Sequence, residues 1–251
     1  FGWVAEDFAK QLLREGHQVW ATTTRTEKII SLKEQGIHGM VADFENLVAL
    51  PLTSIKFDYV LVSIPASSKL NVIQTKLRFD NIAYFLQEVN YEKLIYLSST
   101  GVYPDIDGTF AESDEQQLKE RLVVAEDIIL ALKHSVVYRL GGLFGKNRIF
   151  AKYYENKVCT TGDQLANFVH VDDVVELLHL GFKHPLQANK YNIVAPLHPT
   201  KKEVILASAK KYAFQEPASW EPKDSFQKLV DSRRIIDELN YSFKYPSPLF
   251  F

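Results

Sequence analysis

The feature that most constrains the fold is an alternation of short apolar runs with amphipathic segments over the first 145 residues. The runs lack a polar face, which is typical of strands buried on both sides. Between them, apolar residues recur three and four positions apart, as on a helix with one buried face. Strands are expected at 19–21, 40–42, 58–63, 94–97 and 135–140, and helices at 4–13, 26–35, 70–89 and 114–133. This order predicts an α/β fold with a doubly wound parallel sheet.

The pattern is less regular after Gly145. Further helices are expected at 149–156, 171–182, 200–213 and 232–239, and a further strand at 191–194. Thr200 and Glu203 have the spacing of a capping box, in which each side chain bonds the other residue's backbone N–H. The stretch 214–251 is expected to be a small, irregular cap.

Charge and cysteine content exclude several classes of protein. Lysine and arginine number 29 against 31 acidic residues, a net charge of −2. A dedicated nucleic-acid binder would carry a basic excess, so neither nucleic acid nor an anionic membrane surface is an expected partner. Cys159 is the one cysteine, which excludes a disulfide framework. No apolar run approaches the ~18 residues of a membrane span, so we expect a soluble, cytoplasmic protein.

The first residues fit part of a phosphate-binding turn. Gly2, Trp3, Val4 and Ala5 match the last four positions of the G-x-G-x-x-G/A fingerprint of dinucleotide-binding folds. In that turn a glycine lets the backbone approach the pyrophosphate. The interpretation predicts that a first strand and a first glycine precede Phe1. A glycine at the start of a helix in an unrelated fold fits these four residues equally well.

Arg25 follows the expected strand at 19–21, which is the second strand if one precedes Phe1, and dinucleotide-binding folds recognise the adenosine ribose at the end of that strand. An acidic residue there binds the 2′-hydroxyl of NAD, whereas an arginine accepts the 2′-phosphate of NADP. No Asp or Glu lies between Trp20 and Thr26, and Arg25 can grip a phosphate bidentately. The segment therefore favours NADP, with NAD as the other cofactor considered. A surface loop capped by Arg25 is the alternative.

Four segments in order resemble one enzyme family. They are LSSTGVYP at 97–104, YRLGGLFG at 138–145, NFVHVDDV at 167–174 and YNIV at 191–194. Together they resemble the extended short-chain dehydrogenases/reductases, the NAD-dependent epimerase/dehydratase family. The short C-terminal part resembles its atypical branch, which is similar to nucleoside-diphosphate-sugar epimerases.

The resemblance implies a domain division and a site. Residues 1–145 would form a Rossmann-type NAD(P)-binding domain to which 170–194 return, and 146–169 with 195–251 a small substrate-binding region. Ser99 would be catalytic, its hydroxyl bonding the substrate oxygen that changes oxidation state. Asp43 would accept a bond from the adenine amine. With the fingerprint, the expected cofactor-binding residues are Gly2, Trp3, Val4, Arg25, Asp43, Phe44, Ser63, Ile64, Pro65, Ser98, Leu140 and Gly141. Hydrogen bonding at the strand end is the alternative for both serines.

The chain departs from the family at its acid/base pair. The family carries Tyr-x-x-x-Lys at the start of the next helix, where the lysine lowers the pKa of a phenol that is otherwise ~10. The segment EQQLKERL at 115–122 contains no tyrosine, and Tyr103 is followed four residues later by Asp107. No tyrosine–lysine pair is therefore assigned.

Three interpretations stay open. Lys119 or Arg121 approaches the ribose while substrate or water carries the proton, although a solvated helix face also explains these two residues. Tyr103 or Tyr138 serves as a displaced acid/base, although core packing also explains Tyr138. Finally, the chain binds the cofactor without redox chemistry.

His170, Asp172 and Asp173 do not predict a metal site. His170 and Asp173 stand three residues apart, but no third ligand is evident nearby. A carboxylate at the start of the expected helix 171–182 is favoured by the helix dipole, which explains the two aspartates. No metal is therefore expected.

The sequence thus predicts an NADP-linked oxidoreductase, epimerase or dehydratase acting on a small, sugar-like substrate such as a sugar nucleotide. The alternative is a dinucleotide-binding regulatory or scaffold protein without catalysis. A homodimer through helices 70–89 and 114–133 is also expected. Leu118, Leu122, Val123 and Ile129 are candidates for its interface, although core packing explains them equally well.

Overall fold

The computed structural model describes residues 1–46 and 55–250 and divides them into two compact units. The first unit comprises Phe1–Ser98 and Glu120–Val137, and the second comprises Ser99–Lys119 and Tyr138–Phe251. The predicted substrate-binding region, 146–169 and 195–251, lies within the second unit. Across the described ranges, no helix is long and apolar enough to cross a membrane.

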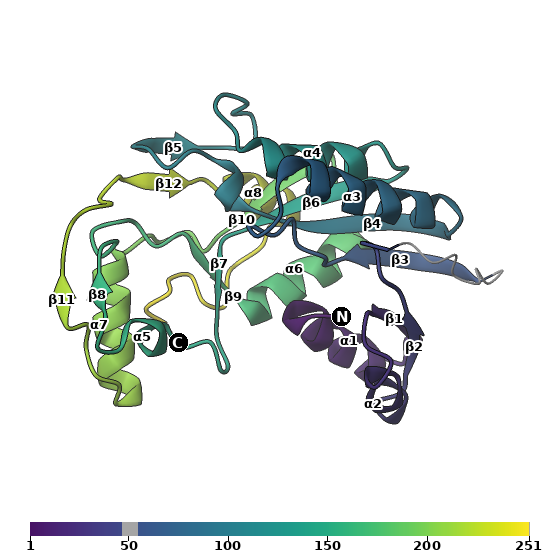
Figure 1. Ribbon diagram of the computed structural model, residues 1–251, viewed down its shortest axis with the longest axis horizontal. Coiled ribbons are helices and arrows are strands. Elements are labelled where there is room, and N and C mark those ends of the chain that lie inside the picture. Colours follow the sequence, from purple (N-terminus) through teal and green to yellow (C-terminus); the bar gives the residue numbers. More distant parts are fainter. Residues whose placement is uncertain (47–54, 251) are drawn as a thin grey trace. The chain divides into compact units, whose positions relative to one another are not determined.

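The first unit begins with a helix and a pair of parallel strands (Figure 1). Helix α1 (Trp3–Arg14) leads into β1 (Val19–Thr23), and α2 (Lys28–Glu34) leads into β2 (Ile37–Val41). The strands pair in parallel with Val19 opposite Ile37. Gly16 follows α1 with φ +84°, a conformation that glycine adopts without strain. These elements confirm the expected helix–strand alternation.

A four-stranded parallel sheet in the order β10-β6-β4-β3 is the largest sheet of the described residues. Its strands are β3 (Lys56–Val62), β4 (Asn90–Ser99), β6 (Ser135–Leu140) and β10 (Lys190–Ile193). Leu94, Ile95 and Tyr96 on β4 are fully buried. This burial matches the apolar run without a polar face, and the predicted α/β fold with a parallel central sheet is confirmed.

Helices α3 (Val72–Gln87) and α4 (Glu120–Leu130) lie side by side in the first unit (Figure 1). Asn71 caps α3 in a capping box with Gln74. The helix predicted over 114–133 starts later than expected. Gln117 has φ +54°, outside the helical region, and the backbone N–H of Lys119 donates to Val102 O at 2.8 Å. The chain therefore enters the helix only at Glu120.

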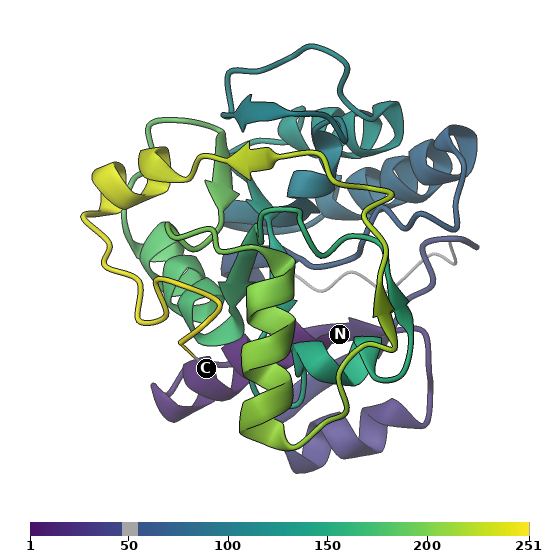
Figure 2. The same cartoon turned by 90° about the vertical axis from the view of Figure 1, so that its left-hand side faces the viewer.

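The second unit combines short parallel strand pairs with helices. It contains η1 (Thr100–Val102), β5 (Gly108–Phe110), β7 (Gly142–Phe144), α5 (Phe150–Tyr154), β8 (Val158–Cys159), β9 (Phe168–His170), α6 (Val171–Lys183), α7 (Lys201–Tyr212), β11 (Ser219–Trp220), β12 (Lys228–Val230) and α8 (Arg233–Leu239). Strand β12 pairs with β5, β7 with β9 and β11 with β8. Helices α5 and α7 pack together (Figure 2).

Two expectations about helix starts are confirmed in this unit. Thr200 and Glu203 form the predicted capping box of α7. Asp172 and Asp173 lie in the first turn of α6, where the helix dipole favours carboxylates. Asp173 is also fully buried, which the sequence pattern did not predict.

Candidate functional site

The carboxyl ends of β1, β2 and β3 form the predicted cofactor edge of the first unit. Gly2 is the N-cap of α1 in an extended conformation, with φ −118° and ψ −179°. A Cβ atom at Gly2 would meet nothing within 4 Å, and Gly2 itself provides no side-chain cap to the helix. Val4 is buried and Trp3 is half-buried in the first turn of α1. Amide groups at a helix N-terminus attract anions, so this turn has the chemistry of a phosphate site.

The strand β1 contacts the start of this turn and leads to Arg25. The nitrogen of Phe1 donates to Thr22 O of β1 at 2.9 Å, which holds the start of α1 at the end of β1. The Arg25 side chain is exposed, with its Nε 3.9 Å from a Glu27 carboxylate oxygen. Arg25 lies three residues after Thr22, whose backbone oxygen contacts Phe1 at the start of the predicted phosphate turn.

Asp43 and Phe44 follow β2. The Asp43 carboxylate accepts bonds from Glu45 N at 2.9 Å and Asn46 Nδ2 at 3.1 Å, both in its own loop. The Phe44 ring is buried and lies edge-on to Phe85 of α3, with 5.6 Å between centroids. Asp43 keeps lone pairs for an adenine amine, while Phe44 anchors the loop on α3. Their predicted adenine contacts stay a prediction.

Helix α3 ties the end of β2 to the end of β3. Asn81 donates to Phe44 O at 2.9 Å. Arg78 pairs with Glu45 and also donates to Pro65 O at 3.3 Å. The predicted residues Ser63 and Ile64 are half-buried after β3, and Pro65 is exposed. Arg78 was not predicted, because nothing in the helical pattern of α3 marks which polar side chain turns toward the loops.

Ser98, at the end of β4, makes a buried bond to α4. Its hydroxyl donates to Glu126 Oε1 at 2.6 Å, and the Glu126 side chain is fully buried. Burial and then the Glu126 charge raise the pKa of the neighbouring Tyr96. Ser98 is therefore engaged at the sheet–helix contact, and its predicted cofactor contact stays a prediction.

In the second unit, Ser99 has a different partner. Its Oγ accepts a bond from Gly101 N at 3.0 Å and so caps η1. This is the hydrogen bonding at the strand end that was the alternative interpretation. The bond uses only an acceptor position of the hydroxyl, so its proton remains able to bond a substrate oxygen. Both interpretations of Ser99 fit this geometry.

Leu140 and Gly141 lie where β6 meets the segment before β9. Thr100 Oγ1 donates to Leu140 O at 3.3 Å, and Leu140 is buried. Gly141 N donates to Ile193 O at 3.0 Å. A Cβ atom at Gly141 would lie 2.5 Å from Asn167 O, so the close approach of the two backbones requires glycine.

The structure disfavours Tyr103 and Tyr138 as displaced acid/base groups. Tyr103 is fully buried, with its hydroxyl 2.8 Å from Asn192 Oδ1 and 2.9 Å from Arg139 Nη1. Burial raises the pKa of Tyr103, against the lowering effect of Arg139. Tyr138 is also fully buried, donates to Leu177 O at 3.2 Å, and has a pKa raised by burial. Both hydroxyl groups are hydrogen-bonded to other residues of the second unit.

Lys119 and Arg121, the two cations near the absent Tyr-x-x-x-Lys pair, belong to different units. Lys119 Nζ lies 2.6 Å from Asp105 Oδ2 in the second unit. Arg121, in the first unit, donates from Nη1 to Ala66 O, just after the predicted cofactor residues 63–65. Of these two residues, Arg121 is therefore the one that contacts the segment following β3.

No group of three potential metal ligands gathers among the described residues. His170 Nδ1 accepts a bond from Asp172 N at 3.1 Å, and its ring stacks on Tyr245 with 3.7 Å between centroids. Both contacts explain His170 as a structural residue of α6.

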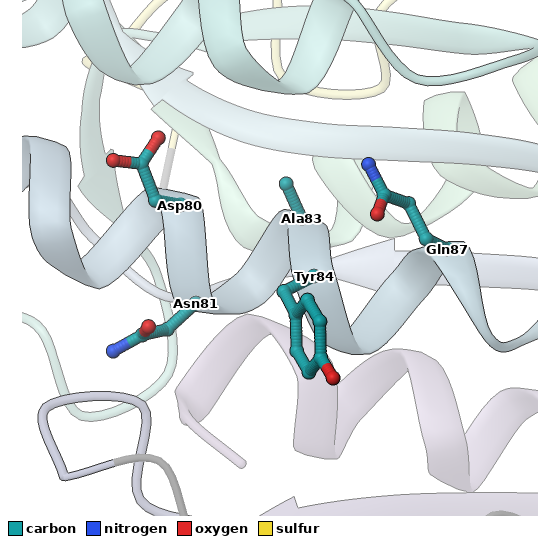
Figure 3. Close-up of a pocket in the computed structure, with 5 residues that line it drawn as sticks. All are labelled: Asp80, Asn81, Ala83, Tyr84 and Gln87. Atoms are coloured by element: carbon teal, nitrogen blue, oxygen red, sulfur yellow. The ribbon is translucent and has the colours of Figure 1, made fainter.

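A shallow, open pocket of about 500 Å³ lies on α3 (Figure 3). Its lining residues all come from this one helix: Asp80, Asn81, Ala83, Tyr84 and Gln87. None of them is a predicted site residue, and the pocket does not coincide with the carboxyl ends of the strands.

Comparison with known proteins gives no matching family model. Protein YeeZ of Escherichia coli K12 is 27% identical, over 99% of this chain and 95% of its own length. A functionally unknown conserved protein from Silicibacter pomeroyi aligns with TM-score 0.78, 21% identity, and 99% and 93% coverage of this chain and its own.

Two further structures were solved with a nicotinamide cofactor. The dTDP-glucose 4,6-dehydratase of Bacillus anthracis, in complex with NAD, aligns with TM-score 0.73 and 12% identity, covering 97% of this chain and 89% of its own. Human epimerase family protein SDR39U1, solved with NADPH, aligns with TM-score 0.69 and 14% identity, covering 98% of this chain and 93% of its own. The chain has the fold of the extended short-chain dehydrogenases/reductases. The structural resemblance predicted from four short motifs is thereby confirmed.

Proposed function

We propose that the protein is an NAD(P)-dependent oxidoreductase of the epimerase or dehydratase type that acts on a small, sugar-like substrate such as a sugar nucleotide. The observation that carries this proposal is a set of contacts among the residues that follow β1, β2 and β3 in the first unit. Phe1 N bonds Thr22 O, Ala42 N bonds Thr23 O at 2.9 Å, and Arg78 bridges Glu45 and Pro65. Ligands of doubly wound sheets bind at this edge, beyond the carboxyl ends of the strands.

The chemistry of the edge suits a dinucleotide. The backbone amide groups in the first turn of α1 have the chemistry to bind a pyrophosphate. Loops after β2 and β3 would cover the adenosine and the second ribose. The nicotinamide would supply hydride transfer, and the chain would supply binding and orientation. The similar dehydratase and epimerase family proteins, solved with NAD or NADPH, support a nicotinamide cofactor.

Arg25 and Lys28 favour NADP over NAD. Both follow β1, whose Thr22 O contacts Phe1 N at the start of the predicted phosphate turn. Segment 21–26 holds no acidic residue that would bind a 2′-hydroxyl. An exposed guanidinium with only a 3.9 Å contact to Glu27 is available to a 2′-phosphate.

For catalysis we assign Ser99 as the donor to the substrate oxygen. Its acceptor position is occupied by Gly101 N, which orients the hydroxyl. Arg121 would supply positive charge near the cofactor from its position at Ala66 O. Since Tyr103 and Tyr138 are engaged elsewhere, the proton would be carried by substrate or water.

Dinucleotide binding without catalysis is the second candidate function. It is favoured by one observation: no tyrosine lies at 115–122, and the hydroxyls of Tyr103 and Tyr138 are both bonded inside the second unit. Turnover on a panel of sugar nucleotides and carbonyl compounds separates the candidates. Binding of NADPH without any turnover would favour the second.

The cofactor proposal is tested by titrating NADPH and NADH into the protein and following nicotinamide fluorescence. We expect NADPH to bind more tightly than NADH. Replacing Arg25 with alanine should weaken NADPH binding about 10-fold or more, because a charge-assisted bond to the 2′-phosphate is lost, and leave NADH binding within about 2-fold. Failure of the unsubstituted protein to bind either cofactor would overturn the proposal.

A further inference from the structure

Arg78 of α3 bonds two loops of the first unit that follow different strands. One is the β2 loop, residues 43–46, and the other is the β3 loop, residues 63–66. The Arg78 guanidinium pairs with Glu45 through Nη2 and donates from Nη1 to Pro65 O at 3.3 Å. Two different nitrogens of one planar group therefore reach the two loops at once.

Burial keeps the Arg78 side chain in this position. It is 14% exposed, whereas the side chain of its partner Glu45 is 57% exposed. A long side chain held in this way has given up most of its rotamer freedom on folding, so a ligand that binds beside it does not have to order it. The guanidinium thus sets the spacing of the two loops before a ligand binds.

Each loop also has a contact with a helix that does not involve Arg78. In the β2 loop, Phe44 O accepts a bond from Asn81 of α3 at 2.9 Å. In the β3 loop, Ala66 O accepts a bond from Arg121 of α4. Without Arg78, each loop would therefore keep a helix contact of its own, while the bridge that sets their spacing would be lost.

We propose that Arg78 is a positioning residue that couples the two halves of a bound dinucleotide. The inference rests on the proposed function, in which the β2 loop covers the adenosine and the β3 loop covers the second ribose. A ligand that spans both loops needs them at one spacing, and a bridge that sets this spacing in advance lowers the entropy cost of binding. A ligand that contacts the β2 loop alone gains nothing from the bridge.

Charge attraction is the alternative explanation, because an arginine attracts a phosphate even without a bridge. The two explanations differ at Glu45. If charge alone mattered, removal of the Glu45 carboxylate would strengthen the binding of an anionic cofactor, since a repulsive charge is lost. If the bridge matters, the same change weakens binding, because Arg78 loses its partner on the β2 loop.

The test is calorimetric titration of the whole chain with NADPH and, separately, with 2′,5′-ADP, the adenosine half of that cofactor. NADH and ADP replace them if NADH binds more tightly. Arg78→Ala and Glu45→Ala should each weaken binding of the dinucleotide about 10-fold and leave binding of its adenosine half within about 2-fold. Because both substitutions break the same bridge, the double variant should bind the dinucleotide about as weakly as either single variant.

Lys76→Ala is the matched control. It removes the same charge from the same helix, but Lys76 pairs with Asp80 of α3 at 2.6 Å and not with a loop. Dinucleotide binding should stay within about 2-fold of the unsubstituted protein. Thermal unfolding of each variant checks its fold.

Three results would each overturn the coupling role and leave the proposed function standing. They are unchanged dinucleotide binding by Arg78→Ala, an equal loss for the dinucleotide and its adenosine half, and tighter dinucleotide binding by Glu45→Ala. If the unsubstituted protein bound neither NADPH nor NADH, the proposed function would be refuted and the coupling role with it.

Discussion

Two adjacent serines at the end of β4 show how far a residue type alone predicts a role. Ser98 donates to the buried Glu126, whereas Ser99 accepts from Gly101 N. The motif indicated both positions as site residues, but alternation along a strand sends neighbouring side chains to opposite faces. Only the structure shows that Ser98 donates to Glu126 of α4 and that Ser99 accepts from Gly101 N. The Ser99 hydroxyl can therefore still donate a hydrogen bond.

Ser99→Ala should therefore reduce turnover with little effect on stability. Loss of one hydrogen bond to a developing charge lowers kcat about 100-fold, while NADPH affinity should change by less than about 2-fold. Steady-state kinetics on a responding substrate, with cofactor titration beside it, measures both. Ser98→Ala is the control for stability, since it leaves the buried Glu126 without its 2.6 Å donor. A Ser99→Ala variant with unchanged kcat would contradict the catalytic assignment.

At the scale of elements, local sequence signals predicted helices and strands well. Strand pairs between segments far apart in the sequence were not predicted. The strand at 135–140 has the predicted bounds, and the Thr200–Glu203 capping box forms as expected. Strands β5 and β12 were missed, because each has three residues and Gly108 pairs with Lys228 far along the chain. Arg78 was missed for a related reason: its partners lie on two loops whose proximity only the fold creates.

Asp173, which was predicted to lie at a helix start, also binds the C-terminal segment. Its carboxylate accepts bonds from Tyr241 Oη at 2.7 Å, Lys244 N at 2.7 Å and Tyr245 N at 3.1 Å. Three donors from the C-terminal segment thus converge on one buried group at the start of α6. The hydrogen bonds explain why this segment, which contains no strand, keeps a defined path along the second unit.

We expect Asp173→Asn to lower the free energy of unfolding by about 2–3 kcal/mol, because an amide leaves one of these buried donors unpaired. Asp172→Asn is the control, since its carboxylate is partly exposed and lies 3.9 Å from both Lys146 and Lys244. It should cost less than about 1 kcal/mol. Urea unfolding of both variants measures the difference, and equal losses would refute the anchoring role.

At the scale of the whole molecule, two of the four residues considered for the expected dimer interface are buried. Leu122 and Ile129 of α4 are buried within the first unit, so they serve its own core. Helix α3 instead carries Ile73, Leu77 and Tyr84 on its surface, with 79%, 56% and 62% of each residue exposed. These side chains are the ones that a partner chain would cover.

A homodimer through α3 therefore stays our prediction, tested by sedimentation velocity at micromolar concentration. The unsubstituted chain should sediment as a dimer, and Leu77→Glu should sediment as a monomer, because two copies of a buried, unpaired carboxylate would face the symmetric interface. Ile30→Glu is the matched control: Ile30 of α2 is 69% exposed, so the same charge enters a different surface and the dimer should persist. A monomeric unsubstituted chain would reject the dimer, and a dimer that survives Leu77→Glu would place the interface away from α3.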